Sequence, residues 1–194
     1  RQMCIRDRYK VYNGNLLYHG CVPLKEDGNL KSVRIFGRAY KGKGLYEVLE
    51  SYVRKGFYAM DPKEKERGKD IMWYIWLSEN SPLFGKDKMA TFERYFLAEK
   101  ETHKEKKNPY YLLLEDEKVV EKILKEFGLE NEDAHIINGH VPVKCKDGEN
   151  PVKCGGKVLV IDGGFSKAYQ KETGIAGYTP VSYTHLRAHE TSAH

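Results

Sequence analysis

The sequence predicts an α+β fold in which short strands near both ends of the domain enclose a helical middle. Short apolar runs that end in glycine occur at residues 16–20 and 136–139, and such runs bounded by turn residues are typical of strands. Between them, apolar residues recur three and four positions apart, which marks one buried face of a helix. We therefore expect a domain over residues 9–180 with a helical insertion at about residues 40–130.

The first strands are expected in the N-terminal part of this domain. The run LLYHG, residues 16–20, ends at a glycine, and EDGN at residues 26–29 has the composition of a hairpin turn before SVRIF. Two strands should therefore precede the helical insertion.

Three helices are expected next. Their signals are LYEVLESYVRKGF at residues 45–57, MATFERYFLA at 89–98 and KVVEKILKEF at 118–127. Gly128 follows the third run in the position of a helix C-cap. The runs at residues 63–69 and 99–107 mix both charges, which is typical of a solvated helix face or a surface loop.

The last part of the domain is expected to return to strands. HIING, HVPVK and KVLVIDGG are rich in β-branched residues and contain glycine turns, and a Lys- and Gly-rich loop at residues 144–157 separates them.

Residues 1–8 and 181–194 are expected to derive from a sequencing-library adapter. Codons that encode residues 182–185 can be the reverse complement of codons that encode residues 3–6, which places one DNA element inverted at both ends. Such segments carry no information about the fold. Without them Lys+Arg falls from 33 to 29 and Asp+Glu from 28 to 26, so the net charge falls from +5 to +3.

The composition restricts the class of protein. No apolar run is long enough to cross a bilayer, and a mild positive charge from scattered lysines does not call for nucleic acid, so we expect neither partner. Cys21, Cys145 and Cys154 are odd in number and no secretory signal precedes them, which favours a reducing, cytoplasmic location. The oligomeric state stays open.

Two histidine motifs are the strongest candidates for chemistry. His19 lies in YHGCVP and His140 in NGHVP, each where an apolar run meets a glycine. A neutral imidazole at such a turn is a common ligand of divalent metals. Taken alone, each motif is a weak signal, because a histidine beside a glycine is more often a turn or core residue.

Longer strings resemble the class 3 fructose-1,6-bisphosphatases, which belong to the calcineurin-like metallophosphoesterases. These strings are NGNLLYHGCVPL, WYIWLSENSPLFGKDKMATFERYF, NPYYLLL, IINGHVPVK and VLVIDGGFSKAYQKETGIAGYT. The resemblance implies the C-terminal portion of an αββα sandwich with a helical insertion. It also implies hydrolysis of the 1-phosphate of fructose 1,6-bisphosphate in gluconeogenesis, by a hydroxide activated at two Mn²⁺ or Mg²⁺ ions.

The resemblance assigns roles to individual residues. His19 and His140 match the late His-Gly and Gly-His ligands of one metal ion, whereas Pro142 stands where many relatives have a further histidine. The Asp-x-His, Gly-Asp-x-x-Asp-Arg and Gly-Asn-His signatures of the superfamily do not occur before His19. We therefore expect a fragment that is inactive by itself, whose catalytic residues lie upstream.

Three basic residues are the candidates for binding the phosphates of the sugar bisphosphate. Lys86, Lys88 and Arg94 lie close together in the sequence, although Lys86 could instead be an exposed loop lysine and Arg94 a structural ion pair. Asp162 follows the apolar run VLVI; it could orient a metal-bound histidine or form a turn at the strand end.

The remaining aromatic and histidine residues are expected to be structural. Trp73 and Trp76 should fill a core, His135 should be hydrogen-bonded within the fold, and His103 should be solvated. Two other functions stay open. One is a calcineurin-like phosphatase for another phosphoester, and the other is a metal-free module that binds anions.

Overall fold

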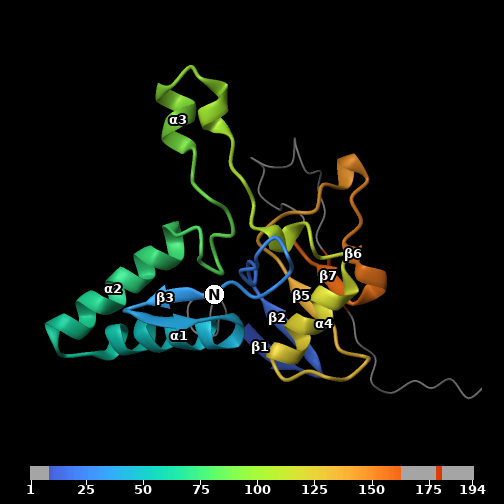
Figure 1. Cartoon of the computed structure of the whole chain (residues 1–194), viewed down its shortest axis with the longest axis horizontal. Coiled ribbons are helices and arrows are strands. Elements are labelled where there is room, and N and C mark those ends of the chain that lie inside the picture. Colours follow the sequence, from blue (N-terminus) through green and yellow to red (C-terminus); the bar gives the residue numbers. More distant parts are fainter. Residues whose placement is uncertain (1–8, 163–177, 181–194) are drawn as a thin grey trace, which may run out of the picture.

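The computed structural model describes residues 9–162 and 178–180, and this part has the expected α+β fold. Its centre is a five-stranded mixed sheet (Figure 1). In spatial order the strands are β1 (Tyr9–Tyr12), β2 (Asn15–Tyr18), β5 (Ile136–Asn138), β7 (Val158–Val160) and β6 (Val152–Lys153).

The pairing of the central strands determines where the functional residues lie. Strands β2, β5 and β7 are parallel, whereas the outer strands β1 and β6 pair antiparallel to their neighbours. Tyr18 lies opposite Asn138, and Asn138 lies opposite Val160. The residues that follow these three strands therefore emerge at the same edge of the sheet.

Helix α4 (Glu117–Glu126) covers one face of this sheet. Asp116 caps its N-terminus by accepting from the backbone N–H groups of Lys118 and Val119. Gly128 ends it at φ +82°, and Leu129 N–H donates to the Leu124 carbonyl at 2.9 Å, which confirms the C-cap. The apolar side of the helix packs with the sheet in one core, which includes Leu16, Ile136, Val158, Val120, Ile123 and Leu124.

A second core lies under a helical hairpin. Strands β3 (Val33–Ile35) and β4 (Arg38–Tyr40) pack beside α1 (Gly42–Tyr58) and α2 (Pro62–Leu77). The two helices approach closely because Gly56 and Gly68 face each other: a Cβ on Gly56 would lie 2.5 Å from the Gly68 Cα. Within the part of the chain that the structure describes, no helix is long and apolar enough to cross a membrane.

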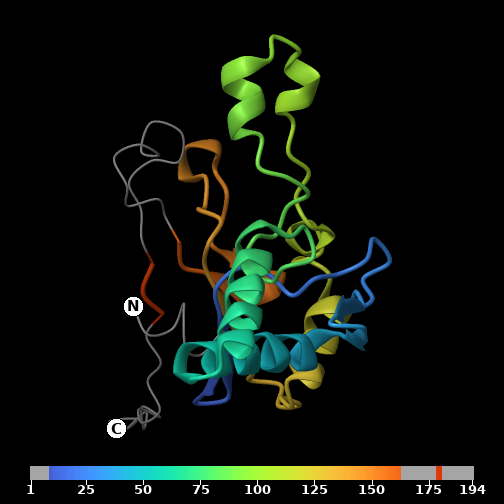
Figure 2. The ribbon, with the colours of Figure 1, turned by 90° about the vertical axis from the view of Figure 1, so that its left-hand side faces the viewer.

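An arm projects from the body of the molecule between α2 and α4 (Figures 1 and 2). It contains α3 (Thr91–Phe96) and the 3₁₀ turn η1 (Lys100–His103), and the turn η2 (Pro109–Tyr111) follows its return to the body. Two further 3₁₀ turns, η3 (Cys145–Asp147) and η4 (Cys154–Gly156), flank β6.

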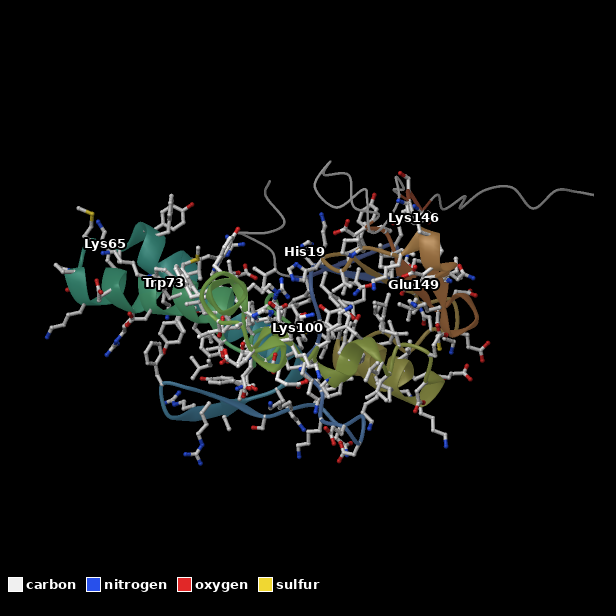
Figure 3. All side chains as sticks on the ribbon, turned by 90° about the horizontal axis from the view of Figure 1, so that it is seen from above. His19, Lys65, Trp73, Lys100, Lys146 and Glu149 are labelled. Atoms are coloured by element: carbon white, nitrogen blue, oxygen red, sulfur yellow. The ribbon has the colours of Figure 1, made fainter. Side chains whose placement is uncertain are left out.

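The prediction that Trp73 and Trp76 fill a core is wrong. Their exposed fractions are 64% and 63%, because the buried residues of α2 are Gly68, Ile71 and Ile75. Figure 3 shows Trp73 on the helical hairpin. The two tryptophans line an open apolar groove between α1 and α2 instead.

The strand expected at residues 140–144 is also absent from the described structure. His140 adopts φ +75°, which ends the extended conformation after Asn138. Pro142 lacks a backbone donor and cannot extend the ladder. Later in this segment, Val143 N–H donates to the Asp162 carbonyl at 2.9 Å.

Candidate metal centre

The two candidate ligands meet at the edge of the sheet where β2 and β5 end. His19 follows β2 directly, and His140 follows β5 after Gly139. The Nε2 atom of His19 lies 3.1 Å from the Nδ1 atom of His140, and the two rings are nearly perpendicular, at 80°. Residues 121 positions apart are thus in direct contact because their strands are parallel neighbours.

The backbone around His140 is shaped for this contact. His140 has φ +75°, a left-handed conformation that non-glycine residues adopt rarely and at a cost of about 1–2 kcal/mol. Gly139 lies under the His19 ring, since a Cβ there would be 3.5 Å from His19 Nδ1. A strained non-glycine residue beside a histidine pair fits a functional site.

Both imidazoles are held in the neutral form. Burial lowers the pKa of His19, and burial together with the charge of His19 lowers the pKa of His140. The carboxylate of Asp162 acts in the opposite direction on both rings. Near pH 7 each ring therefore keeps a nitrogen lone pair.

These properties fit a divalent metal. Two nitrogens 3.1 Å apart can each lie about 2.1 Å from one ion with an angle of about 95° at the metal. Within residues 9–162 and 178–180, no group of three or more His, Cys, Asp or Glu side chains comes together as a metal site. His19 and His140 are therefore a pair of candidate ligands, and the described residues do not supply a full coordination shell.

Asp162 lies at the same edge, two residues after β7. A Cβ on Gly139 would be 3.8 Å from the Asp162 Cβ, and the Asp162 charge acts on both histidines. The structure thus brings Asp162 close to the histidine pair. A carboxylate that orients a metal-bound imidazole lies in such a position.

A loop at residues 81–86 closes over the end of β2. Cys21 N–H donates to the Pro82 carbonyl at 2.7 Å. Gly20, at φ +94°, allows this approach, since a Cβ there would overlap the Pro82 carbonyl oxygen. The Phe84 backbone hydrogen-bonds to His140, so the loop contacts both histidine segments.

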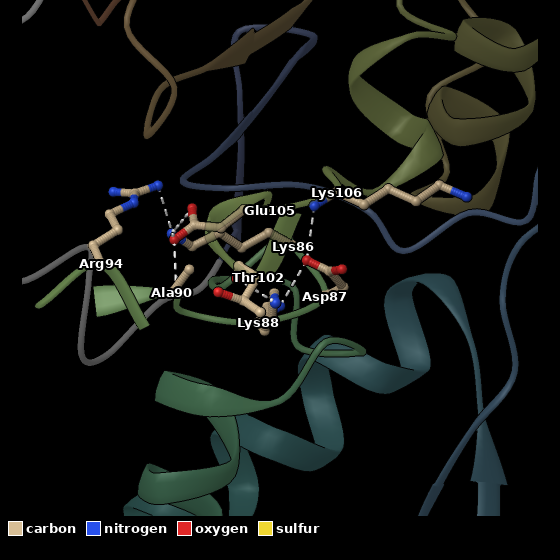
Figure 4. Close-up of polar contacts among 8 residues, drawn as sticks. All are labelled: Lys86, Asp87, Lys88, Ala90, Arg94, Thr102, Glu105 and Lys106. Carbon is tan, nitrogen blue, oxygen red and sulfur yellow. Dashed lines mark hydrogen bonds and ion pairs between the residues drawn. The ribbon is translucent and has the colours of Figure 1, made fainter. Parts of the chain in front are cut away.

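The three basic candidates lie at and above this loop. The Lys86 ammonium lies 5.4 Å from the centre of the Phe84 ring, and its charge contributes to the lowered pKa of His140. Lys88 and Arg94 are on the arm, where Lys88 Nζ donates to the Thr102 carbonyl at 2.7 Å and Arg94 lies 3.5 Å from Glu105 (Figure 4). Lys86 therefore lies on the loop that contacts the histidine segments, whereas Lys88 and Arg94 lie on the arm.

Comparison with known proteins identifies the family. The family model described as Firmicute fructose-1,6-bisphosphatase matches residues 7–191. The chain belongs to this family.

Curated members of the family are closely similar to this chain. It is 60% identical over 174 residues to a class 3 fructose-1,6-bisphosphatase of Clostridioides difficile, an alignment that covers 89% of this chain and 26% of the relative. A class 3 enzyme of Clostridium botulinum is 56% identical over 186 residues, covering 94% of this chain and 28% of the relative. The chain thus spans about a quarter of the length of these bisphosphatases. No solved structure gave a significant match.

Two further histidines of the described residues are hydrogen-bonded within the fold. His135 Nδ1 hydrogen-bonds Asn15 Oδ1 at 3.1 Å, as expected. His103 is partly exposed, which is compatible with the predicted solvated histidine, and its Nε2 lies 3.0 Å from the Leu97 carbonyl oxygen.

The sequence did not reveal a buried polar network beneath the histidine pair. The hydroxyls of Tyr18 and Tyr110 are 2.6 Å apart, and Asn138 Nδ2 donates to the Tyr110 hydroxyl at 3.0 Å and to the Gly20 carbonyl at 3.2 Å. The network links the ends of β2 and β5. In the sequence, the one sign of this network is the polar Asn138 at the end of an apolar strand.

Replacing Tyr110 with Phe should lower the free energy of unfolding by about 1–3 kcal/mol, because the buried hydroxyl of Tyr18 and the amide of Asn138 each lose a partner. Denaturant unfolding of the full-length protein would measure this change in the free energy of unfolding. The matched control, Tyr95→Phe, removes a hydroxyl from a side chain that is 80% exposed and should change nothing. Equal effects of the two substitutions would exclude this role for the network.

Proposed function

We propose that this segment forms part of the active site of a fructose-1,6-bisphosphatase, which hydrolyses the 1-phosphate of fructose 1,6-bisphosphate to fructose 6-phosphate and phosphate. The observation that carries the proposal is the contact between His19 and His140 at 3.1 Å, in a chain 60% identical to a class 3 enzyme. The reaction belongs to gluconeogenesis, and a cytoplasmic location is part of the proposal.

The mixed sheet is proposed to be part of a calcineurin-like sandwich. The proposal is supported by the three parallel strands β2, β5 and β7, whose carboxyl ends carry His19, His140 and Asp162 at one edge. The α1–α2 hairpin and the arm both lie between β4 and β5, as an insertion would.

His19 and His140 are proposed to hold one of two divalent ions, Mn²⁺ or Mg²⁺, in the complete enzyme. When bound, such ions activate water as the nucleophile and neutralise charge on the phosphoryl oxygens. The protein keeps both rings neutral by burial, and we propose that the Asp162 carboxylate, whose charge acts on both rings, orients them. The left-handed backbone of His140 directs its Nδ1 towards His19.

Lys86, Lys88 and Arg94 are proposed to bind the phosphates of the sugar bisphosphate. Each phosphate carries about −1.5 to −2 near pH 7, so the site requires fixed cations in addition to metal. Lys86 is the best placed of the three because its charge acts on His140. Arg94 is 55% exposed and can turn its free donors towards an anion.

Phosphate release by the full-length protein with Mn²⁺ tests the proposed function. We expect kcat/KM for fructose 1,6-bisphosphate to exceed that for a phosphoserine peptide or a dinucleoside polyphosphate by about 100-fold or more, because hydrogen bonds to the sugar discriminate strongly. A preference for either alternative phosphoester would assign the site to another phosphatase. Absence of activity together with unchanged metal content after loss of His19 would instead support a metal-free module.

A further inference from the structure

The base of the arm is closed by contacts between the two chain segments that connect it to the body. Lys86 and Lys107 form an antiparallel bridge, and Asp87 N–H donates to the Lys106 carbonyl at 2.9 Å. The segment that leaves the body at Lys86 therefore lies beside the segment that returns at residues 105–107.

The carboxylate of Glu105 contacts two cationic side chains at the base of the arm (Figure 4). Glu105 Oε2 accepts from Lys86 Nζ at 2.7 Å, and its Oε1 accepts from Ala90 N–H at 2.9 Å. The same Oε1 lies 3.5 Å from a guanidinium nitrogen of Arg94. A single side chain thus contacts two of the three residues proposed to bind phosphate.

Glu105 is ionised in this setting. Partial burial raises its pKa, but the hydrogen bonds from Lys86 and Ala90 and the charges of Lys86 and Arg94 outweigh burial and lower it below the usual range. The Glu105 side chain is 18% exposed and that of Lys86 is 29% exposed, so this ion pair is better shielded than most surface pairs. With Arg94, the group carries a net positive charge.

The loop brings Lys86 near the end of β2, which carries His19. Lys86 follows Gly85, where a Cβ would lie 3.3 Å from Cys21 Sγ, and the loop is anchored by the bond from Cys21 N–H to the Pro82 carbonyl. Lys86 therefore joins the base of the arm to the end of β2.

We propose that Glu105 is a positioning residue, which holds the Lys86 ammonium and the Arg94 guanidinium together so that both bind one phosphate group of the substrate beside the histidine pair. This inference rests on the proposed function. An ammonium has three donors and a guanidinium five, so the contacts with Glu105 leave donors free for phosphate oxygens. Fixed donors bind an anion more tightly than mobile ones because less side-chain entropy is lost on binding.

Steady-state kinetics of Glu105→Gln in the full-length protein test the proposal. We expect the KM for fructose 1,6-bisphosphate to rise about tenfold while kcat stays within about twofold, because binding and not the chemical step depends on the two cations. Glu105→Asp keeps the charge and should restore part of the affinity. An unchanged KM, or a lower KM because Lys86 is released to bind phosphate, would overturn the proposal.

Asp87→Asn is the matched control. Asp87 Oδ1 accepts from the backbone N–H groups of Lys88 and Lys106, each at 2.8 Å, so it also stabilises the base of the arm (Figure 4). Its substitution should leave KM within about twofold of the unmodified protein. An equal rise in KM for Asp87→Asn and Glu105→Gln would show that only the folding of the arm matters.

A direct binding measurement separates this inference from the proposed function. Calorimetric titration with inorganic phosphate should show about tenfold weaker binding to Glu105→Gln than to the unmodified protein, whatever sugar the enzyme prefers. If the unmodified protein does not hydrolyse fructose 1,6-bisphosphate but Glu105→Gln still weakens phosphate binding, the function is wrong and the positioning role stands. Equal phosphate affinity would refute the positioning role.

Discussion

Replacing His140 with Ala in the full-length protein should lower kcat for fructose 1,6-bisphosphate by about a thousandfold and release bound Mn²⁺. The expected loss is large because, in the proposed function, metal supplies the charge that stabilises phosphoryl transfer, and even residues behind the ligands contribute about 10- to 100-fold. His140 lies 3.1 Å from His19 with both rings neutral, so removing either imidazole leaves a single candidate ligand at this edge. Metal analysis of the purified variant and initial-rate kinetics would measure both effects.

Two further variants separate ligand loss from backbone effects. His140→Asn tolerates the left-handed conformation at φ +75° better than Ala does, and should lose metal equally. His103→Ala removes a histidine whose ring bonds only a carbonyl of its own arm among the described contacts, and should keep full activity and metal content. Retention of Mn²⁺ by His140→Asn would mean that the imidazole is not a ligand.

Replacing Gly20 with Ala should destabilise the full-length protein by about 3 kcal/mol or more. Gly20 has φ +94°, and a Cβ there would overlap the Pro82 carbonyl oxygen that accepts from Cys21 N–H. The substitution therefore adds a steric clash to the cost of about 1–2 kcal/mol for a left-handed alanine. Since the displaced loop carries Lys86, the KM for the bisphosphate should rise as well. Denaturant unfolding and steady-state kinetics would measure the two effects.

Gly14→Ala is the matched comparison. Gly14 has φ +73°, but among the described residues no atom would lie within 4 Å of a Cβ added there, so only the backbone cost of about 1–2 kcal/mol applies. The difference between the two variants isolates the contact between the end of β2 and the loop. Equal losses for Gly14→Ala and Gly20→Ala would contradict the close packing described above.

The meeting of His19 and His140 could be predicted because short-range signals and topology agree there. Each histidine follows a strand-like apolar run at a glycine, and parallel pairing of β2 and β5 brings such positions to one edge. Helix α4 was equally predictable, since its apolar periodicity is strong and Gly128 ends it. In both cases local pattern and tertiary packing favour the same structure.

Other elements could not be predicted because their form depends on a distant partner. Helix α2 begins with a charged run, and its contact with α1 is made by Gly68 against Gly56, so its tryptophans remain outside the core. The role of Glu105 appears only when the arm closes, which brings it to Lys86, 19 positions away in the sequence. Gly163 and Gly164, which end the expected segment KVLVIDGG, lie outside the described residues, as does the rest of residues 163–177. The adapter origin of residues 1–8 and 181–194 stays a prediction.

Anomalous X-ray diffraction from crystals of the full-length protein grown with Mn²⁺ tests the central claim most directly. We predict a manganese peak about 2.0–2.3 Å from both His19 Nε2 and His140 Nδ1, with Asp162 beside the pair. Manganese bound elsewhere, with the two imidazoles still in direct contact at 3.1 Å, would contradict the assignment of these histidines as metal ligands.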